Sequence, residues 1–273
     1  MITLEQVQAG LTIVVDKPRQ WTSFQAVNKV KSTVRRLYGL KQFKIGHAGT
    51  LDPLATGILL VCLGKATKQI PTLQDGTKEY TGTFVFGATT PCYDMEQPID
   101  HRHPYSHITA EQLVEKTRQF TGPILQVPPM FSAVKIDGQR AYQYARIDDP
   151  TAVIQPKRVV VERFDITGFR PGDDARENEP IPKTVTPPTE SQAKHPHFYD
   201  NPLCVIPEHL PQADFHITCG KGTYIRSIAR DLGLALDSGA FLASLRRTRV
   251  GDFTLDQAVT LDNIEAYFSG TTL

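Results

Sequence analysis

The segment of the chain best equipped for chemistry is residues 44–68, which holds one carboxylate, Asp52, near its start. Gly46 and Gly49 precede it and allow a tight turn and the close approach of another molecule. Pro53 fixes the backbone directly after Asp52, and an apolar run that must be buried follows. Asp52 is therefore expected on a rigid loop that is anchored by the core, where a carboxylate can serve as a nucleophile.

Taken one at a time, these residues have ordinary explanations. An Asp before a Pro is most often a turn former, and His47, five residues before Asp52, has the usual role of a surface residue. The segment lacks the G-x-x-x-x-G-K-[ST] spacing of a phosphate-binding loop. One His and one Asp do not complete the coordination shell of a metal, so we expect no metal site in this segment.

Short periodic segments around this loop predict the elements that hold it. The β-branched run 11–15 predicts a buried strand. Thr22 or Ser23 can cap a helix that stops at Gly39. Its apolar residues recur at helical spacing: Phe24, Val27, Val30, Val34 and Leu37.

Further strands are expected over 80–86, 158–166 and 214–218, and further helices after the capping box at Thr109 and over 223–236. Strands and helices follow one another without regular alternation. This pattern favours an α+β fold with a mixed or largely antiparallel sheet flanked by helices.

Charge is spread unevenly along a nearly neutral chain. The 273 residues include 30 basic and 29 acidic side chains, and 40% of residues are apolar, which excludes a disordered chain and a globally basic nucleic-acid binder. Residues 17–51 nevertheless hold no acidic residue and eight basic ones: Lys17, Arg19, Lys29, Lys31, Arg35, Arg36, Lys41 and Lys44. Two interpretations stay open, a solvated helix face and a surface that faces phosphates.

Local composition predicts the cellular compartment of the protein and a surface insertion. The first ten residues carry no apolar run typical of a signal peptide, and no segment is long enough to span a bilayer. Four widely spaced cysteines suit reduced, mostly buried thiols in a cytoplasmic protein. The proline-rich residues 171–202 are expected to form a surface insertion or loop.

The loop sequence as a whole is specific. Gly46-His-Ala-Gly-Thr-Leu-Asp52-Pro-Leu-Ala-Thr-Gly57 resembles the signature of the bacterial tRNA pseudouridine-55 synthases, the TruB family, whose motif carries the catalytic Asp. Other blocks that resemble the family follow in family order: Asp16-Lys17-Pro18, Lys78-Glu-Tyr-Thr-Gly82, Gln126 to Lys135, Gly220 to Arg226, and Leu242 to Arg249. The resemblance implies the pseudouridine-synthase fold.

The resemblance also implies an activity: isomerisation of uridine to pseudouridine at position 55 in the T-loop of tRNA, without metal or cofactor. Asp52 would be catalytic, Arg226 would hold its carboxylate ionised, and Tyr80 would stack on the uracil. Attack at the sugar C1′, attack at uracil C6 and formation of a glycal all stay open. The implied substrate-binding residues are His47, Lys17, Lys44, Tyr224 and Leu245, with Arg246, Arg247 and Arg249 joining the phosphate-contacting surface.

Two departures from the family pattern shape the expected domains and partners. The insertion 171–202 is outside the pattern. Only a strand and a short helix are expected in the tail 251–273, so the catalytic domain would occupy 1–250 without a full RNA-binding PUA domain. Leu54-Ala55 suits a stand-alone enzyme, and we expect a monomer that acts on the T-arm of tRNA without guide RNA or membrane.

Two rival functions remain. One is an RNA-folding chaperone with secondary or no catalysis, which the presence of Asp52, Tyr80 and Arg226 argues against. The other is a hydrolase with an aspartyl nucleophile, which needs a base to activate water. His47 is the candidate for that base.

Overall fold

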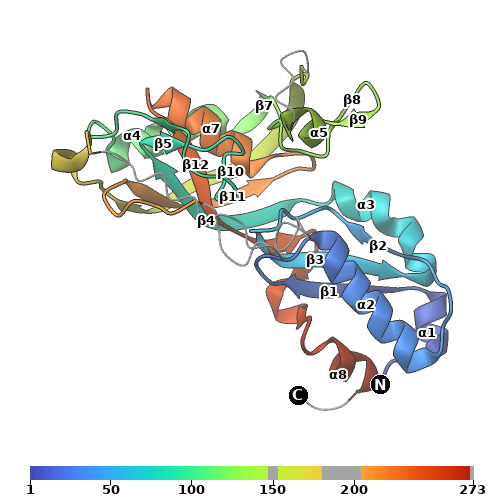
Figure 1. The fold of residues 1–273 in the computed structure, drawn as a ribbon. Helices are drawn as coiled ribbons and strands as arrows, with labels where there is room; N and C mark the ends of the chain where they lie inside the picture. Colours follow the sequence, from blue (N-terminus) through green and yellow to red (C-terminus); the bar gives the residue numbers. More distant parts are fainter. Residues whose placement is uncertain (147–152, 180–203, 271–273) are drawn as a thin grey trace. The chain divides into compact units, whose positions relative to one another are not determined.

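The computed structural model describes residues 1–146, 153–179 and 204–270. These residues form two compact units. The first unit contains residues 1–80 and 245–270, and the second contains the described residues between 81 and 244. Strands β4 (Lys78–Phe86) and β12 (Ala240–Val250) contribute residues to both units (Figure 1).

The first unit is built on a mixed sheet with helices around it. Its other elements are α1 (Leu4–Ala9), β1 (Leu11–Lys17), α2 (Ser23–Tyr38), β2 (Ile45–Ala48), β3 (Thr56–Leu63), the 3-10 helix η1 (Gly64–Gln69), α3 (Ile70–Asp75), β13 (Phe253–Thr254), the 3-10 helix η4 (Leu255–Gln257), β14 (Val259–Thr260) and α8 (Ile264–Ser269). The strand order is β14-β1-β3-β12, with β2 beside β3 and β13 beside β12. β14 is parallel to β1 and β12 is parallel to β3, whereas β1 and β3 are antiparallel.

Helix α2 begins and ends where the sequence predicts. The side chain of Thr22 accepts a hydrogen bond from the Gln25 amide, and the Gln25 side chain closes a capping box. Gly39 ends the helix in the left-handed conformation. Val27, Val30 and Val34 are buried in a core shared with β1 and β3, but Phe24 is 70% exposed. Phe24 shares the helical spacing of the valines but does not share their burial.

The second unit contains five strands of the large sheet, together with helices and two short strand pairs. Besides its parts of β4 and β12, it contains β5 (Ala88–Thr89), β6 (His101–Arg102), α4 (Ala110–Thr117), the 3-10 helix η2 (Arg118–Phe120), β7 (Gly122–Gln126), β8 (Lys135–Ile136), β9 (Gln139–Arg140), α5 (Ala141–Arg146), β10 (Lys157–Arg170), the 3-10 helix η3 (Asp174–Arg176), β11 (Gln212–Cys219) and α7 (Ile225–Ala235). The strand order is β12-β4-β11-β10-β7, and β10 runs antiparallel to both of its neighbours. The expected α+β class with a mixed, largely antiparallel sheet is confirmed.

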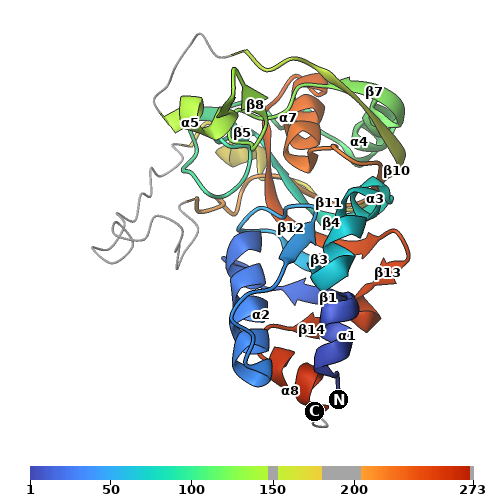
Figure 2. The same cartoon turned by 90° about the vertical axis from the view of Figure 1, so that its right-hand side faces the viewer.

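The tail 251–273 was expected to form a strand and a short helix, and β13 and α8 confirm this. Both termini of the first unit share one core, because Ile264 and Phe268 of α8 pack with Val7 and the valines of α2. Figure 2 shows α8 and β14 beside α2 and β1. Of the proline-rich stretch, 171–179 is described and includes η3, while 180–202 lies outside the described residues. Among the described residues, no helix combines the length and apolar character needed to cross a membrane.

Candidate functional site

The loop that carries Asp52 joins β2 to β3 and is tied to the start of α2. The Leu51 amide donates to Ser23 Oγ (2.9 Å), and the Ser23 hydroxyl donates to the Leu51 carbonyl (3.1 Å). The Ala55 amide donates to the Asp52 carbonyl (3.1 Å), which closes a tight turn. Ser23, Leu51 and Ala55 are buried while Asp52 is half-buried. The carboxylate therefore projects from a backbone that is fixed on both sides, as the sequence predicts.

Lys17 also stabilises the loop that carries Asp52. Its side chain is fully buried, and its ammonium donates to the carbonyls of Pro18 (2.9 Å), Trp21 (2.6 Å) and Pro53 (3.2 Å). The Gln20 amide also donates to the Pro53 carbonyl (2.8 Å). A lysine with this environment cannot reach a phosphate at the surface. Its ammonium instead connects the end of β1 to Pro53, the residue after Asp52, through hydrogen bonds.

The charges around this loop act on one another. Burial lowers the pKa of Lys17 to about 8, and the nearby cation of Arg247 adds to this effect. The carboxylates of Asp52 and Asp16 act in the opposite direction on the pKa of Lys17. Lys17 is thus a buried cation that lies within electrostatic range of the Asp52 carboxylate.

Arg247 holds the other end of the loop. Its side chain is 2% exposed, with Nε donating to the Ile58 carbonyl (2.8 Å) and Nη2 donating to the Gly49 carbonyl (3.1 Å). Gly57 pairs with Arg247 in the parallel ladder of β3 and β12. A Cβ on Gly57 would lie 2.2 Å from the Arg247 carbonyl oxygen, so only glycine permits this approach. The expectation that Arg247 faces phosphates is incorrect, because its guanidinium is buried.

The neighbouring arginines of β12 point elsewhere. Arg246 is partly exposed, pairs with Asp16 (2.7 Å) and donates to Thr56. Arg249 lies 2.5 Å from Glu79. Both cations are therefore partly neutralised by a carboxylate of the same unit, in contrast to the unopposed phosphate surface that the sequence suggested.

His47 lies on β2 and is half-buried. Burial lowers its pKa, and the charge of Arg247 lowers it further, against a smaller opposing effect of a hydrogen bond with the Gly49 backbone. The imidazole is therefore held neutral near pH 7. Lys44 is exposed at the start of the same segment.

Tyr80 and Leu245 belong to the first unit as well. Tyr80 is 8% exposed on β4. Leu245 is half-buried on β12, and its carbonyl accepts a hydrogen bond from Thr56 Oγ1 (3.4 Å). The first unit thus contains Asp52, Tyr80 and Leu245 of the predicted site, together with His47, Lys17 and Lys44.

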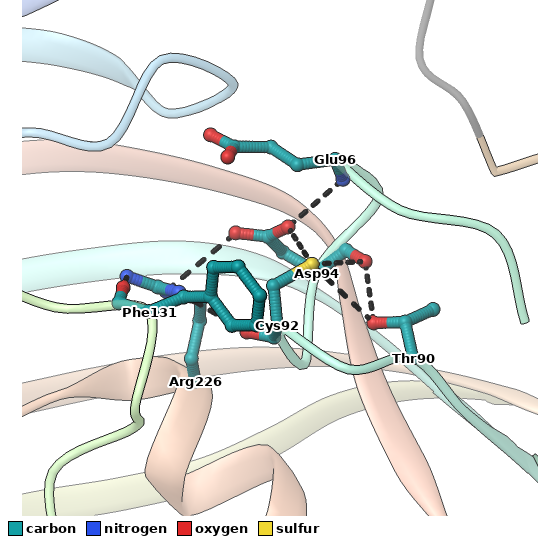
Figure 3. Close-up of polar contacts among 6 residues, drawn as sticks. All are labelled: Thr90, Cys92, Asp94, Glu96, Phe131 and Arg226. Atoms are coloured by element: carbon teal, nitrogen blue, oxygen red, sulfur yellow. Dashed lines mark hydrogen bonds and ion pairs between the residues drawn. The ribbon is translucent and has the colours of Figure 1, made fainter. Parts of the chain in front are cut away.

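Arg226 and Tyr224 belong to the second unit, where Arg226 has a carboxylate of its own. Arg226 and Asp94 are 5% and 4% exposed, and Arg226 Nε lies 3.5 Å from Asp94 Oδ2. Arg226 Nη1 donates to the Cys92 carbonyl (3.1 Å), and Nη2 donates to the Phe131 carbonyl (2.9 Å). Figure 3 shows the guanidinium held between these groups at the start of α7.

Asp94 is fixed in turn by its own neighbours (Figure 3). Its Oδ1 accepts hydrogen bonds from the Glu96 amide and the Cys92 thiol, both at 2.9 Å. Its carbonyl accepts a hydrogen bond from the Thr90 hydroxyl (2.7 Å). Burial and the charge of Asp94 raise the pKa of the Cys92 thiol, so it stays protonated and donates.

Tyr224 caps α7 and is anchored through its backbone. Its amide donates to Gln126 Oε1 (2.8 Å), and Gln126 Nε2 donates back to the Tyr224 carbonyl (3.1 Å). Gln126 is buried at the end of β7. Sequence reasoning predicted Tyr224 and Arg226 but missed Asp94, since no motif distinguishes this Asp from the other acidic residues. Within the described ranges, no group of three or more His, Cys, Asp or Glu side chains is placed to hold a metal ion.

Two solved structures share the fold. The first, described as "Crystal Structure of a Cbf5-Nop10-Gar1 Complex", aligns with a TM-score of 0.60 at 26% identity and covers 97% of this chain. The second, described as "Crystal structure of the archaeal box H/ACA sRNP Nop10-Cbf5 complex", aligns with a TM-score of 0.56 at 24% identity and covers 96% of this chain. The alignments span 56% and 54% of those chains.

The sequence matches two family models. One is described as "TruB family pseudouridylate synthase (N terminal domain)" and matches residues 35–181. The other is described as "tRNA pseudouridylate synthase B C-terminal domain" and matches residues 226–272. Fold and sequence together place the chain in the enzyme class of the pseudouridylate synthases.

Similar curated proteins extend the match to nearly the whole chain. A protein named tRNA pseudouridine synthase B from Flavobacterium johnsoniae is 42% identical over 97% of this chain and 98% of its own length. Proteins of the same name from Bacteroides fragilis and Thermobifida fusca are 42% and 41% identical, over 92% and 94% of this chain and 90% and 75% of their own lengths. The chain belongs to the TruB family, as its motifs predict.

Proposed function

We propose that this enzyme isomerises uridine to pseudouridine at position 55 in the T-loop of tRNA, with Asp52 as the catalytic carboxylate. The name shared by its relatives, tRNA pseudouridine synthase B, supports tRNA as the substrate. The observation that carries the assignment of Asp52 is its loop: a half-buried carboxylate between buried neighbours, fixed by Ser23 and by Lys17.

The reaction requires one carboxylate and a pocket that retains the base. The bond between C1′ and N1 breaks, the uracil turns, and C1′ is joined to C5, while C5 loses a proton and N1 gains one. Because the base never leaves, rejoining is effectively unimolecular. Asp52 would attack C1′ or C6, or remove a proton from C2′. Each route uses the carboxylate in its ionised form, and Lys17 is a cation within electrostatic range of it.

The other residues take roles that suit their positions. Tyr80 is proposed to stack on the target uracil, and Leu245 is proposed to line its pocket. That Tyr224, which belongs to the second unit, also contacts the base stays a prediction. The neutral His47 would fill the space of the flipped nucleotide, where a planar ring offsets part of the cost of unstacking. Lys44, which is exposed, is proposed to contact phosphate.

The burial of Lys17 and the ion pair of Arg226 bear on the roles expected for these two residues. For Lys17 we propose a positioning role in place of phosphate binding, because its ammonium is buried among carbonyls. That Arg226 is the cation partner of Asp52 stays a prediction. Its charge is already paired with Asp94 in the second unit.

The expected partners and compartment stay predictions too. These are action without guide RNA, a monomeric enzyme, a catalytic domain over 1–250, and a cytoplasmic location. The cytoplasmic location rests on the four widely spaced cysteines, which are free and buried.

The experiment incubates the full chain with an unmodified tRNA transcript and maps pseudouridine by carbodiimide-blocked reverse transcription. We expect one strong stop at position 55 and none in a transcript with cytidine there. Pseudouridine elsewhere in the tRNA would contradict the position but keep the activity. Tight binding of tRNA without any pseudouridine would favour the chaperone alternative.

A further inference from the structure

One apolar side chain of α2 does not follow the rest of the helix. Phe24 is 70% exposed, whereas Val27, Val30 and Val34 are buried. It occupies the first turn of α2, directly after the capping residue Thr22 and the buried Ser23. Its ring is therefore open to a partner outside the core.

Phe24 begins a stripe along the helix. Residues spaced by three and four lie on one face of an α-helix, and from Phe24 this rule leads to Asn28, Lys31 and Arg35. Phe24, Asn28 and Arg35 are exposed and Lys31 is partly exposed. At 1.5 Å per residue the stripe is about 16 Å long. An aromatic ring, an amide and two cations therefore stand in a row on one face of α2.

The cations of this stripe are not neutralised by the protein. Within the described residues, no ion pair includes Lys31 or Arg35. Arg36, the next residue but about 100° around the helix, pairs with both carboxylate oxygens of Glu265 on α8. α2 itself contains no acidic residue. The stripe thus keeps its positive charge, while the arginine beside it does not.

The stripe starts at the loop of Asp52. Ser23, adjacent to Phe24, exchanges hydrogen bonds with Leu51, adjacent to Asp52. Both pairs are linked inside the first unit, so the position of Phe24 relative to the loop is fixed by buried contacts. Phe24 thus follows directly after the residue that holds the loop, and Lys31 and Arg35 lie further along the same helix.

We propose that this stripe binds the RNA strand next to the target uridine, with an unpaired base stacked on Phe24 and phosphates on Lys31 and Arg35. The inference rests on the proposed function. Aromatic rings bind bases of any sequence through their faces, and cations along the same groove hold the backbone. An acidic peptide would use the cations but gain nothing specific from a flat ring, so RNA fits the stripe better.

The first test separates stacking from mere apolar contact. The equilibrium Kd for tRNA is measured with the full chain carrying Phe24→Leu or Phe24→Tyr. Phe24→Leu is expected to raise Kd at least fivefold, roughly the loss of one stacked base, and to leave the salt dependence unchanged. Phe24→Tyr should bind like the parent chain. Leu125→Ala, at a comparably exposed position of β7 (68%), is the matched control.

The second test addresses the charges. The double variant Lys31→Gln, Arg35→Gln should weaken tRNA binding and flatten the slope of log K against log salt by about 1.5, the release of counterions from two phosphates. Arg36→Gln changes one neutralised cation on the same helix and is expected to leave the slope within about 0.3 of the parent value. Thermal unfolding of every variant checks that the helix is intact.

Unchanged affinity in Phe24→Leu, or an equal slope change in Arg36→Gln and in the double variant, would overturn the inference. Saturable binding of an acidic peptide to the stripe that tRNA does not displace would do the same. These outcomes differ from failure of the proposed function, which appears as a parent chain that binds tRNA but forms no pseudouridine.

Discussion

The buried pair of Arg226 and Asp94 makes the sharpest prediction about stability. Their charges lie 3.5 Å apart with both side chains about 5% exposed. At an effective dielectric constant of about 20, that distance corresponds to a Coulomb attraction of about 5 kcal/mol. Asp94→Asn removes this attraction but keeps an oxygen for the Glu96 amide and the Cys92 thiol. The main loss is therefore the charge that compensates Arg226.

Breaking a buried pair from one side costs about 3–5 kcal/mol, because the other charge stays buried. We expect the free energy of unfolding to fall by about 3 kcal/mol in Asp94→Asn. For a chain of this size the corresponding drop in Tm is about 6 °C or more. Calorimetry at pH 7 measures it directly.

The matched control is Asp214→Asn. Asp214 pairs with Arg170 at 2.6 Å in the same unit, but those side chains are 38% and 53% exposed. Exposed pairs contribute about 0–1 kcal/mol, so the control should lose no more than about 2 °C. Equal Tm values for the two variants, or no loss in Asp94→Asn, would refute the reasoning that Asp94 compensates the charge of Arg226.

Three further predictions concern the loop of Asp52. Burial lowers the pKa of Lys17 from 10.5 to about 8, so between these pH values the unfolded chain holds a proton that the folded chain has lost. We therefore compare the free energy of unfolding of the parent with that of Lys17→Met, by urea titration at several pH values. The difference, parent minus variant, should rise by about 3 kcal/mol between pH 8 and pH 10.5. A fall would contradict the burial of this charge. Gly57→Ala places a Cβ against the Arg247 carbonyl at a φ of +95° and should cost about 2–4 kcal/mol. In Gly39→Ala, with φ +65° and open space, the cost should be about 1 kcal/mol; equal costs in urea unfolding would argue against the close approach. Arg247→Met frees the loop at Gly49 and should lower kcat at least about tenfold with little change in KM, whereas Arg246→Met, at a partly exposed position, should act mainly on KM. The opposite split in steady-state kinetics would reverse the two assignments.

Local signals of the sequence predicted most elements correctly. The limits of α2 follow from the capping box at Thr22 and from Gly39, and α4 follows from the capping box at Thr109. The apolar run at 58–63 is buried in β3 as expected. These features depend on neighbours within a few residues, and this is why a single sequence suffices for them.

Contacts between distant residues escaped prediction. Helical spacing groups Phe24 with the valines of α2, but the core contains the valines and not Phe24. The basic run assigned Lys17 to the surface, although its ammonium is bound by carbonyls that include that of Pro53, 36 residues further along the chain. Asp94 carried no motif, and only the fold brings it to Arg226, 132 residues later. Side-chain charge alone does not tell which cations are buried.

The most direct test of the central claim is the reactivity of Asp52→Ala toward tRNA labelled with tritium at C5 of uridine. Because C5 loses its hydrogen when it bonds to C1′, each turnover releases one label into water. We predict that Asp52→Ala releases no tritium above background in a single-turnover reaction, while its Kd for tRNA stays within about threefold of the parent value. Release at the parent rate by Asp52→Ala would contradict the account.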